Sequence, residues 1–406
     1  MKGVAMRKYI GTMVIIVAIV SGWSLVAAQA AQGNSSGASA LHPYVEGDVT
    51  YDSNVNNAPA NAKGDTYLDG IAGIRGGYTT YALDLSGLGF IGRRSYNDSS
   101  DRGDFTTFGD VLKGKYGTRD QMVIEVDHSF RRVDDFDRYG SEAAVGGISP
   151  DSALDASSSD LRDIHQIGVS LGRNLTDKTE FDLGYRFDSL NYDSASLYDL
   201  ISHYVQAESA YRMTDKTAGT LTLKYGLQRN DTLDETADYT AARIGLKTRG
   251  SDKLTFKVGG GVQNYEYGAD NNKKTSFNFD GTALWMATEK LMLQFGGRNG
   301  MQLSSLYADN GTEYSIFWAG AACRVSTAVT LSTAASYRKD DYLEPVLADG
   351  LLIDRQDKGT GARVRAEYQT PAAGMKLYAE ALYEKVDSNV SSYDKTSVGA
   401  GAVLTY

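Results

Sequence analysis

Side chains able to carry out catalytic chemistry are few in this sequence and lie far apart. The four histidines are His42, His128, His165 and His203, and no two of them are three to five residues apart. The chain has no Gly-x-Ser-x-Gly, phosphate-binding or zinc motif. Its single cysteine, Cys323, excludes an intrachain disulfide and a cysteine-rich metal site. We therefore expect a protein that is not an enzyme and that holds no cofactor and no metal.

Charged side chains that could select a solute recur at alternate positions of apolar segments. The basic positions are Lys224, Arg243, Lys247, Lys257, Arg363 and Arg365, and the acidic ones are Glu125, Asp127, Asp182, Glu208, Glu380 and Glu384. Because side-chain charge along a water-filled path sets its selectivity, the basic arc of Lys224, Arg243, Lys247 and Lys257 predicts a preference for anionic or hydroxyl-rich solutes. The alternative is a balanced wall with no single substrate. On the same face, sugar rings could stack on Tyr239, Tyr314, Trp318 and Tyr378, or these rings only fill space.

The elements that carry these side chains have the period of β-strands. In residues 181–187, Phe181, Leu183, Tyr185 and Phe187 alternate with Asp182, Gly184 and Arg186. The same alternation recurs in residues 221–227 and 254–258. Strands place successive side chains on opposite faces, so each segment has one apolar and one polar face. The whole chain after residue 43 is therefore expected to be all-β.

Counting such segments predicts about eighteen antiparallel strands, with sixteen possible. The expected spans are 44–52, 66–77, 79–93, 105–116, 120–131, 163–174, 179–189, 202–213, 218–229, 238–249, 253–264, 275–286, 290–300, 313–325, 329–338, 360–370, 375–386 and 394–406. Short polar turns alternate with longer connections, as in outer-membrane β-barrels, which have short periplasmic turns and long external loops. The longest connection, residues 133–160, is a candidate constriction of the lumen, or else an external loop. Another long one is 339–358.

Strand length and inward charge favour a transmembrane barrel over a soluble sandwich. Strands of about ten residues can cross a bilayer when tilted, whereas charged inner faces could not form the core of a sandwich. A closed barrel turns the apolar face to lipid and satisfies every backbone edge. Interfacial aromatic girdles are expected from Tyr51, Tyr78, Tyr185, Tyr211 and Tyr225. A β-propeller or β-helix is the second architecture.

The two ends of the chain carry expected targeting signals. Residues 1–30 resemble a secretory signal peptide, with a basic start, an apolar run and cleavage after Ala30. A periplasmic segment, 31–42, and the barrel, 43–406, follow. The last strand ends in Leu404 and Tyr406, which resembles the signal read by the barrel assembly machinery. The predicted location is the outer membrane of a Gram-negative bacterium after Sec export, in contact with lipid and lipopolysaccharide. The acidic chain, with charge −10, is not expected to bind nucleic acid.

The segment from Pro43 to Val55, with its Tyr-Asp-Ser-Asn sequence, resembles the opening of the putative β-barrel porin type 2 family. The Thr-Asp-Lys turns at 176–178 and 214–216 are similar to turns in that family, whereas the turn at 326–329 lacks the Asp-basic pair. The resemblance implies a channel that accompanies exopolysaccharide or capsular polysaccharide export, with periplasmic export proteins as partners and the polymer as cargo.

Three other functions stay open on the sequence. A general diffusion porin for small hydrophilic solutes is the main alternative to the export conduit. A structural or adhesive barrel with a plugged lumen is a third possibility. An outer-membrane enzyme would need a compact acidic or Ser/His site, which the sequence does not reveal.

Overall fold

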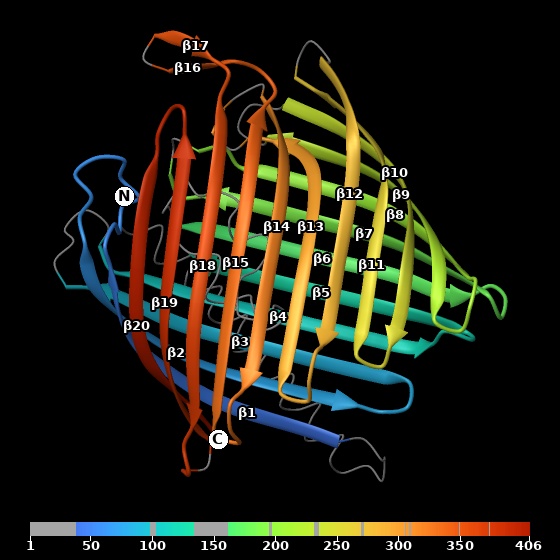
Figure 1. Ribbon diagram of the computed structural model, residues 1–406, viewed down its shortest axis with the longest axis horizontal. Coiled ribbons are helices and arrows are strands. Elements are labelled where there is room, and N and C mark those ends of the chain that lie inside the picture. Colours follow the sequence, from blue (N-terminus) through green and yellow to red (C-terminus); the bar gives the residue numbers. More distant parts are fainter. Residues whose placement is uncertain are drawn as a thin grey trace, which may run out of the picture.

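The chain forms a closed antiparallel β-barrel in the computed structural model (Figure 1). The structure describes residues 38–97, 103–133, 161–194, 197–230, 235–268, 272–304, 306–307, 310–348, 350–372 and 374–406. One sheet contains eighteen strands, which confirms the expected number rather than sixteen. It closes where the first strand pairs with the last, from Tyr44 opposite Thr405 to Asp52 opposite Ser397. No helix in the described ranges is long and apolar enough to cross a membrane.

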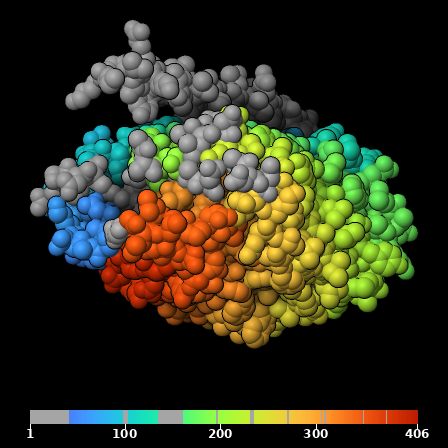
Figure 2. All heavy atoms as spheres, turned by 90° about the horizontal axis from the view of Figure 1, so that it is seen from above, coloured from blue at the N-terminus to red at the C-terminus, as the bar shows by residue number. Residues whose placement is uncertain are grey.

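The strands follow the order of the sequence around the barrel. The first nine are β1 (Ala38–Asp52), β2 (Asp65–Thr79), β3 (Leu83–Tyr96), β4 (Phe105–Thr118), β5 (Met122–Val133), β6 (Arg162–Asn174), β7 (Thr179–Tyr192), β8 (Leu200–Arg212) and β9 (Thr217–Asn230). The other barrel strands are β10 (Glu235–Ser251), β11 (Leu254–Tyr267), β12 (Asn272–Met286), β13 (Leu291–Leu303), β14 (Gly311–Arg324), β15 (Val329–Tyr342), β18 (Gln356–Gln369), β19 (Met375–Ser388) and β20 (Tyr393–Thr405). Figure 2, a view from above, shows the sequence colours following one another around the molecule, so that blue N-terminal and red C-terminal segments meet.

Most strands run a few residues beyond the expected spans on the side of the longer connections. The first strand begins at Ala38, within the segment expected to precede the barrel. Two short strands, β16 (Val346–Ala348) and β17 (Leu351–Ile353), form a hairpin inside the connection expected over 339–358. Of the connection 133–160, only Val133 is described; the expected constriction lies in residues 134–160, outside the described residues.

The apolar side chains of the strands lie on the outer face of the barrel. Val126, Val169 and Val205 are 44%, 38% and 45% exposed, and the register places them, with Tyr185 and Tyr225, on one face of neighbouring strands. On the opposite face, side chains meet across intervening strands: Lys257 of β11 reaches Glu208 of β8 at 2.9 Å. Only the concave face of a curved sheet brings such distant strands together, so that face lines the lumen.

Two belts of aromatic side chains border the outer apolar band. Near the short turns lie Tyr116, Tyr211, Trp285 and Tyr368, and nearer the long connections lie Tyr185, Tyr225, Phe277, Tyr337 and Tyr383. Phe277 and Trp285 are eight residues apart on β12, which is about 26 Å along a strand and about 20 Å along the axis at a tilt of about 40°. This height suits the apolar band of an outer-membrane barrel.

Candidate functional site: the inner wall of the barrel

One ladder of the barrel is incomplete, and it allows a strand end to turn into the lumen. The pairing of β12 with β13 stops at Asp280 opposite Arg298, although β12 extends outward to Asn272 and β13 extends to Leu303. Residues 299–303 of β13, the inturned arm, leave β12 and reach β9, where the Leu303 backbone N donates to Gln228 Oε1 at 3.0 Å. The arm therefore crosses the inner face of β12, β11 and β10.

Asn299 closes the edge that the arm leaves behind on β12. Its side-chain nitrogen donates to the Phe277 carbonyl at 2.6 Å, and its side-chain oxygen accepts from the Phe279 backbone N at 2.6 Å. The Asn278 side chain donates to the Asn299 carbonyl at 3.0 Å. These bonds replace strand pairing where the ladder ends, which matters because an unpaired backbone group in lipid is costly.

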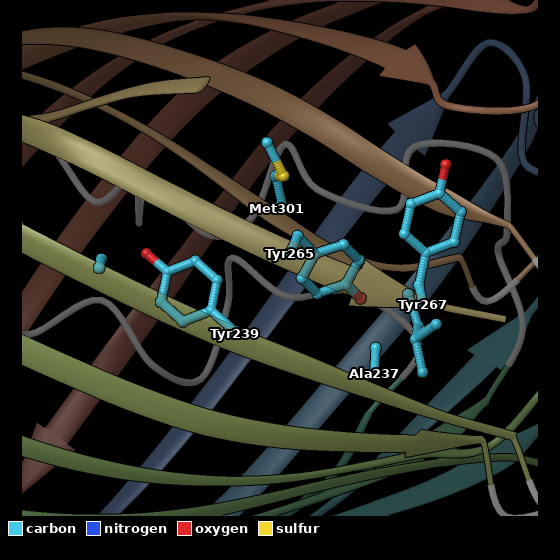
Figure 3. Close-up of a cluster of buried hydrophobic side chains, with 7 residues drawn as sticks. Ala237, Tyr239, Tyr265, Tyr267 and Met301 are labelled. Atoms are coloured by element: carbon cyan, nitrogen blue, oxygen red, sulfur yellow. The ribbon is translucent and has the colours of Figure 1, made fainter. Parts of the chain in front are cut away.

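The inturned arm packs on a cluster of buried side chains from β10 and β11. Met301 and Leu303 of the arm contact a group formed by Ala237, Tyr239, Ala241, Tyr265 and Tyr267 (Figure 3). Figure 3 shows the rings of Tyr239, Tyr265 and Tyr267 in a row along the wall strands, with Met301 next to Tyr265. The Tyr265 side chain is 0% exposed, so the arm covers this part of the wall.

Gln228 of β9 connects the arm to the wall beneath it. Its Oε1 accepts from the Leu303 backbone N at 3.0 Å and from the Tyr265 hydroxyl at 2.8 Å. Its Nε2 donates to the Tyr204 hydroxyl at 2.6 Å. Because all three partners lie on different strands, a single amide ties β8, β11 and β13 to β9.

Lys224, Arg243, Tyr204 and Tyr239 form a cation–tyrosine patch beside this cluster. The Lys224 Nζ lies 3.9 Å from the centroid of the Tyr204 ring and 5.3 Å from that of Tyr239, distances at which a ring face attracts a cation. Gly226 makes room for this arrangement, because a Cβ there would lie 2.4 Å from Tyr204.

The four cations of the expected basic arc have different surroundings. Lys257 forms an ion pair with Glu208 at 2.9 Å, and the Thr222 hydroxyl also donates to Glu208 at 3.3 Å. Among the described residues, no carboxylate lies within 4.0 Å of the charged groups of Lys224, Arg243 or Lys247. Lys247 lies directly opposite Lys257 in the ladder of β10 and β11. Lys224, Arg243 and Lys247 are therefore the cations of this sector that form no direct ion pair with a described carboxylate.

The charges of β18 and β19, by contrast, neutralise one another. Glu380 accepts from Arg363 at 2.6 Å and from Arg365 at 3.2 Å, and Arg365 also pairs with Glu367 at 3.0 Å. Glu384 pairs with Lys395 at 3.3 Å on β20. This sector is a network of ion pairs rather than a basic stretch.

The remaining acidic candidates lie on β5 and β7 of the same inner face. Glu125 pairs with Lys115 at 3.0 Å, and Asp182 pairs with Arg119 at 3.2 Å. Asp127 lies directly opposite Lys113 in the ladder of β4 and β5. The register thus places all twelve charged candidates on the inner face, while their role in selectivity remains a prediction.

The four aromatic residues considered for sugar stacking are largely occupied by protein groups. Arg365 covers the Tyr378 ring at 3.9 Å, and the Tyr378 hydroxyl donates to Glu46 at 2.7 Å. Arg338 lies 5.2 Å from the Tyr314 ring centroid. Trp318 packs over Gly296, and Tyr239 belongs to the buried cluster under the arm.

Sequence reasoning missed Tyr204, Gln228 and Asn299. Tyr204 and Gln228 alternate with exposed apolar residues on their strands, so period two places them inside. Nothing local shows that they meet Lys224 or the arm, because those contacts depend on how β13 leaves the wall. Asn299 resembles any other polar residue near a strand end.

The structure is similar to those of several solved proteins, at low sequence identity. OpdK from Pseudomonas aeruginosa, solved with vanillate, is 12% identical over 90% of this chain and 99% of that chain, with a TM-score of 0.47. OccAB3 from Acinetobacter baumannii is 10% identical over 91% of this chain and 99% of its own, with a TM-score of 0.43. A loop L8 deletion mutant of OmpT from Vibrio cholerae is 14% identical over 92% and 100%, with a TM-score of 0.43.

No curated protein matches the sequence. The family model described as putative beta-barrel porin 2 matches residues 27–406, which includes every strand of the barrel and the segment from Pro43 to Val55. The match agrees with the closed eighteen-stranded sheet, its apolar outer band and its charged inner wall. The chain therefore belongs to the putative beta-barrel porin 2 family and is a porin-like β-barrel channel of the outer membrane.

Proposed function

We propose that the barrel is a diffusion channel for small hydrophilic solutes and that it favours anionic ones. The observation that carries this proposal is the difference between the two charged sectors of the wall. Lys224, Arg243 and Lys247 have no described carboxylate within 4.0 Å, whereas Arg363 and Arg365 share Glu380. A cation without a direct ion-pair partner attracts mobile anions more strongly than one in an ion pair, which presents little net field to the lumen.

The inturned arm supports a small solute rather than a polymer as the permeant. The arm crosses the inner face of three strands and buries the tyrosines beneath it. It therefore reduces the width available beside the cation–tyrosine patch. A solute that passes there would meet Lys224 and Arg243 at close range, where the charge has most effect.

Ion selectivity in planar bilayers tests the proposal. The triple variant K224Q/R243Q/K247Q should shift the reversal potential in a KCl gradient away from chloride and towards potassium. The control K178Q/K216Q/K290Q removes the same formal charge from the short turns and should move it much less. An unchanged reversal potential in the first variant, or equal shifts in both, would contradict the proposal. Complete absence of conductance in the unmodified protein would instead favour a plugged barrel.

A conduit for exopolysaccharide is the finer role that the family resemblance implied, and only that resemblance supports it. Three of the four aromatic residues that could have stacked on sugar rings are engaged by arginines or buried, namely Tyr378, Tyr314 and Tyr239, which gives a polymer fewer stacking surfaces. The proposal also includes the expected targeting steps and partners. These are export through Sec with cleavage after Ala30, recognition of Leu404 and Tyr406 by the assembly machinery, and contacts with lipopolysaccharide or periplasmic export proteins. Tyr406 is 69% exposed, which leaves it accessible to a binding partner.

A further inference from the structure

Three histidines that are far apart in the sequence lie on the outer face of β5, β6 and β8. The register gives His128, His165 and His203 the same side as the exposed valines Val126 and Val205. His203 accepts or donates a hydrogen bond at 2.8 Å with the hydroxyl of Tyr185, which belongs to the outer aromatic belt. The histidines therefore lie at the edge of the apolar band, on the side of the long connections, where lipid headgroups meet water.

His128 and His165 approach each other through the same ring atom. Their Nε2 atoms are 3.0 Å apart, with ring centroids 5.0 Å apart and planes inclined by 79°. Phe130 and Phe187 flank the His165 ring edge-on at 6.1 and 5.9 Å and restrict its orientation. Two imidazole nitrogens thus lie side by side on the outer face, at hydrogen-bonding distance.

Asp110, on the neighbouring strand β4, sets the tautomer of His128 through a hydrogen bond. Its Oδ2 lies 2.8 Å from His128 Nδ1, so the Nδ1 proton of His128 is donated to the carboxylate. With Nδ1 protonated in the neutral ring, Nε2 of His128 carries a lone pair that points towards His165. A carboxylate that orients a histidine through its other nitrogen is the usual outer-shell support of a metal ligand.

The distance between the two nitrogens suits a shared metal ion. Nitrogen ligands lie about 2.0–2.1 Å from such an ion, so two of them are about 3.3–3.4 Å apart at the tetrahedral angle of Zn²⁺ and about 2.8–3.0 Å apart at the 90° angle of square-planar Cu²⁺. The observed separation of 3.0 Å matches the square-planar angle, and a small movement of either ring reaches the tetrahedral one. Among the described residues, no group of three or more His, Cys, Asp and Glu side chains surrounds one metal position. Any site here is therefore open, with two protein ligands.

We propose that His128 and His165 bind one divalent transition-metal ion, of the Zn²⁺ or Cu²⁺ class, on the outer face of the barrel, with Asp110 as the positioning residue. Water completes the coordination. The site does not depend on the channel proposal, since it faces away from the lumen. Imidazole ligands suit Zn²⁺ and Cu²⁺ and do not suit Ca²⁺ or Mg²⁺.

Metal titration of untagged, folded protein in detergent tests the site. Isothermal calorimetry with Zn²⁺ should give one site per chain, and Cu²⁺ should give an electron paramagnetic resonance spectrum with two nitrogen ligands. H128Q and H165Q should each lower the affinity at least tenfold, and D110N should lower it about 10- to 100-fold. H203Q is the matched control, because it removes a histidine from the same face, and it should leave the affinity unchanged.

The change in gel mobility between unheated and heated samples verifies that each variant still folds into the barrel. The proposal is overturned if the unmodified protein binds no Zn²⁺ below millimolar concentrations. It is equally overturned if H128Q and H165Q bind as tightly as the unmodified protein, or if H203Q loses as much affinity as they do. If the two imidazoles only form a hydrogen bond with each other, the unmodified protein should bind no Zn²⁺ below millimolar concentrations.

Discussion

Replacing Gln228 with Leu should release the inturned arm. Leucine fills a similar volume but leaves the Leu303 backbone N and the Tyr265 hydroxyl without their hydrogen-bond partner at 3.0 and 2.8 Å. Tyr265 is 0% exposed, so water cannot take the place of the lost bond there. Each buried polar group left unpaired costs about 1–3 kcal/mol, which predicts a loss of about 2–6 kcal/mol in the free energy of unfolding.

Urea unfolding of the refolded barrel in lipid vesicles, followed by tryptophan fluorescence, measures this loss. Gln206 is the matched control, because it lies on the inner face of β8 with no hydrogen bond between its side chain and another described residue. Q206L should change the free energy of unfolding by no more than about 0.5 kcal/mol. In bilayer recordings, Q228L should also show larger or noisier openings. A loss below about 1 kcal/mol together with an unchanged conductance would refute the idea that this amide holds the arm.

Three further outcomes follow from the same contacts. N299A removes both side-chain bonds to the open edge of β12, and it should lower the free energy of unfolding in urea by about 2–4 kcal/mol. Hydrogen exchange of the Phe279 amide should become faster, and unchanged exchange would contradict this prediction. G226A forces the Tyr204 ring to move, and it should reduce chloride selectivity in bilayers without reducing the amount of folded barrel. R94M leaves Asp69 buried without the two hydrogen bonds that Arg94 donates at 2.8 and 2.9 Å. It should lower the free energy of unfolding in urea by about 3–5 kcal/mol, and the double variant R94M/D69L should recover most of that loss.

The barrel itself was predictable because its signal is local. Alternation of apolar and polar residues fixes which face each side chain occupies, and it placed every charged candidate, from Glu125 to Glu384, on the inner wall. The strand ends were less predictable, because beyond the lipid both faces are polar and the alternation fades. Residues 235–237 of β10 are an example.

The sequence predicted which charged residues line the inner wall, but not which of them contact one another. Which charges neutralise one another depends on barrel closure, which brings Lys257 to Glu208 across two intervening strands while it leaves Lys224 with tyrosines. The spacing of His128 and His165 in the sequence suggested isolated side chains. Adjacent antiparallel strands joined by a long connection place them at a 3.0 Å contact instead. Neither result can be read from a window of a few residues.

The incomplete ladder between β12 and β13 also has a mechanical consequence. Backbone pairing joins these strands only from Asp280 to Met286, and the ladder that closes β1 with β20 spans only Tyr44 to Asp52. Every other neighbouring pair of barrel strands shares a longer run of backbone pairing. The cylinder is thus composed of two curved shells, β1–β12 and β13–β20, fastened along two weak seams. Under tension it should part along those seams first, and a chain cut in the turn between Met286 and Leu291 retains each shell as a continuous sheet.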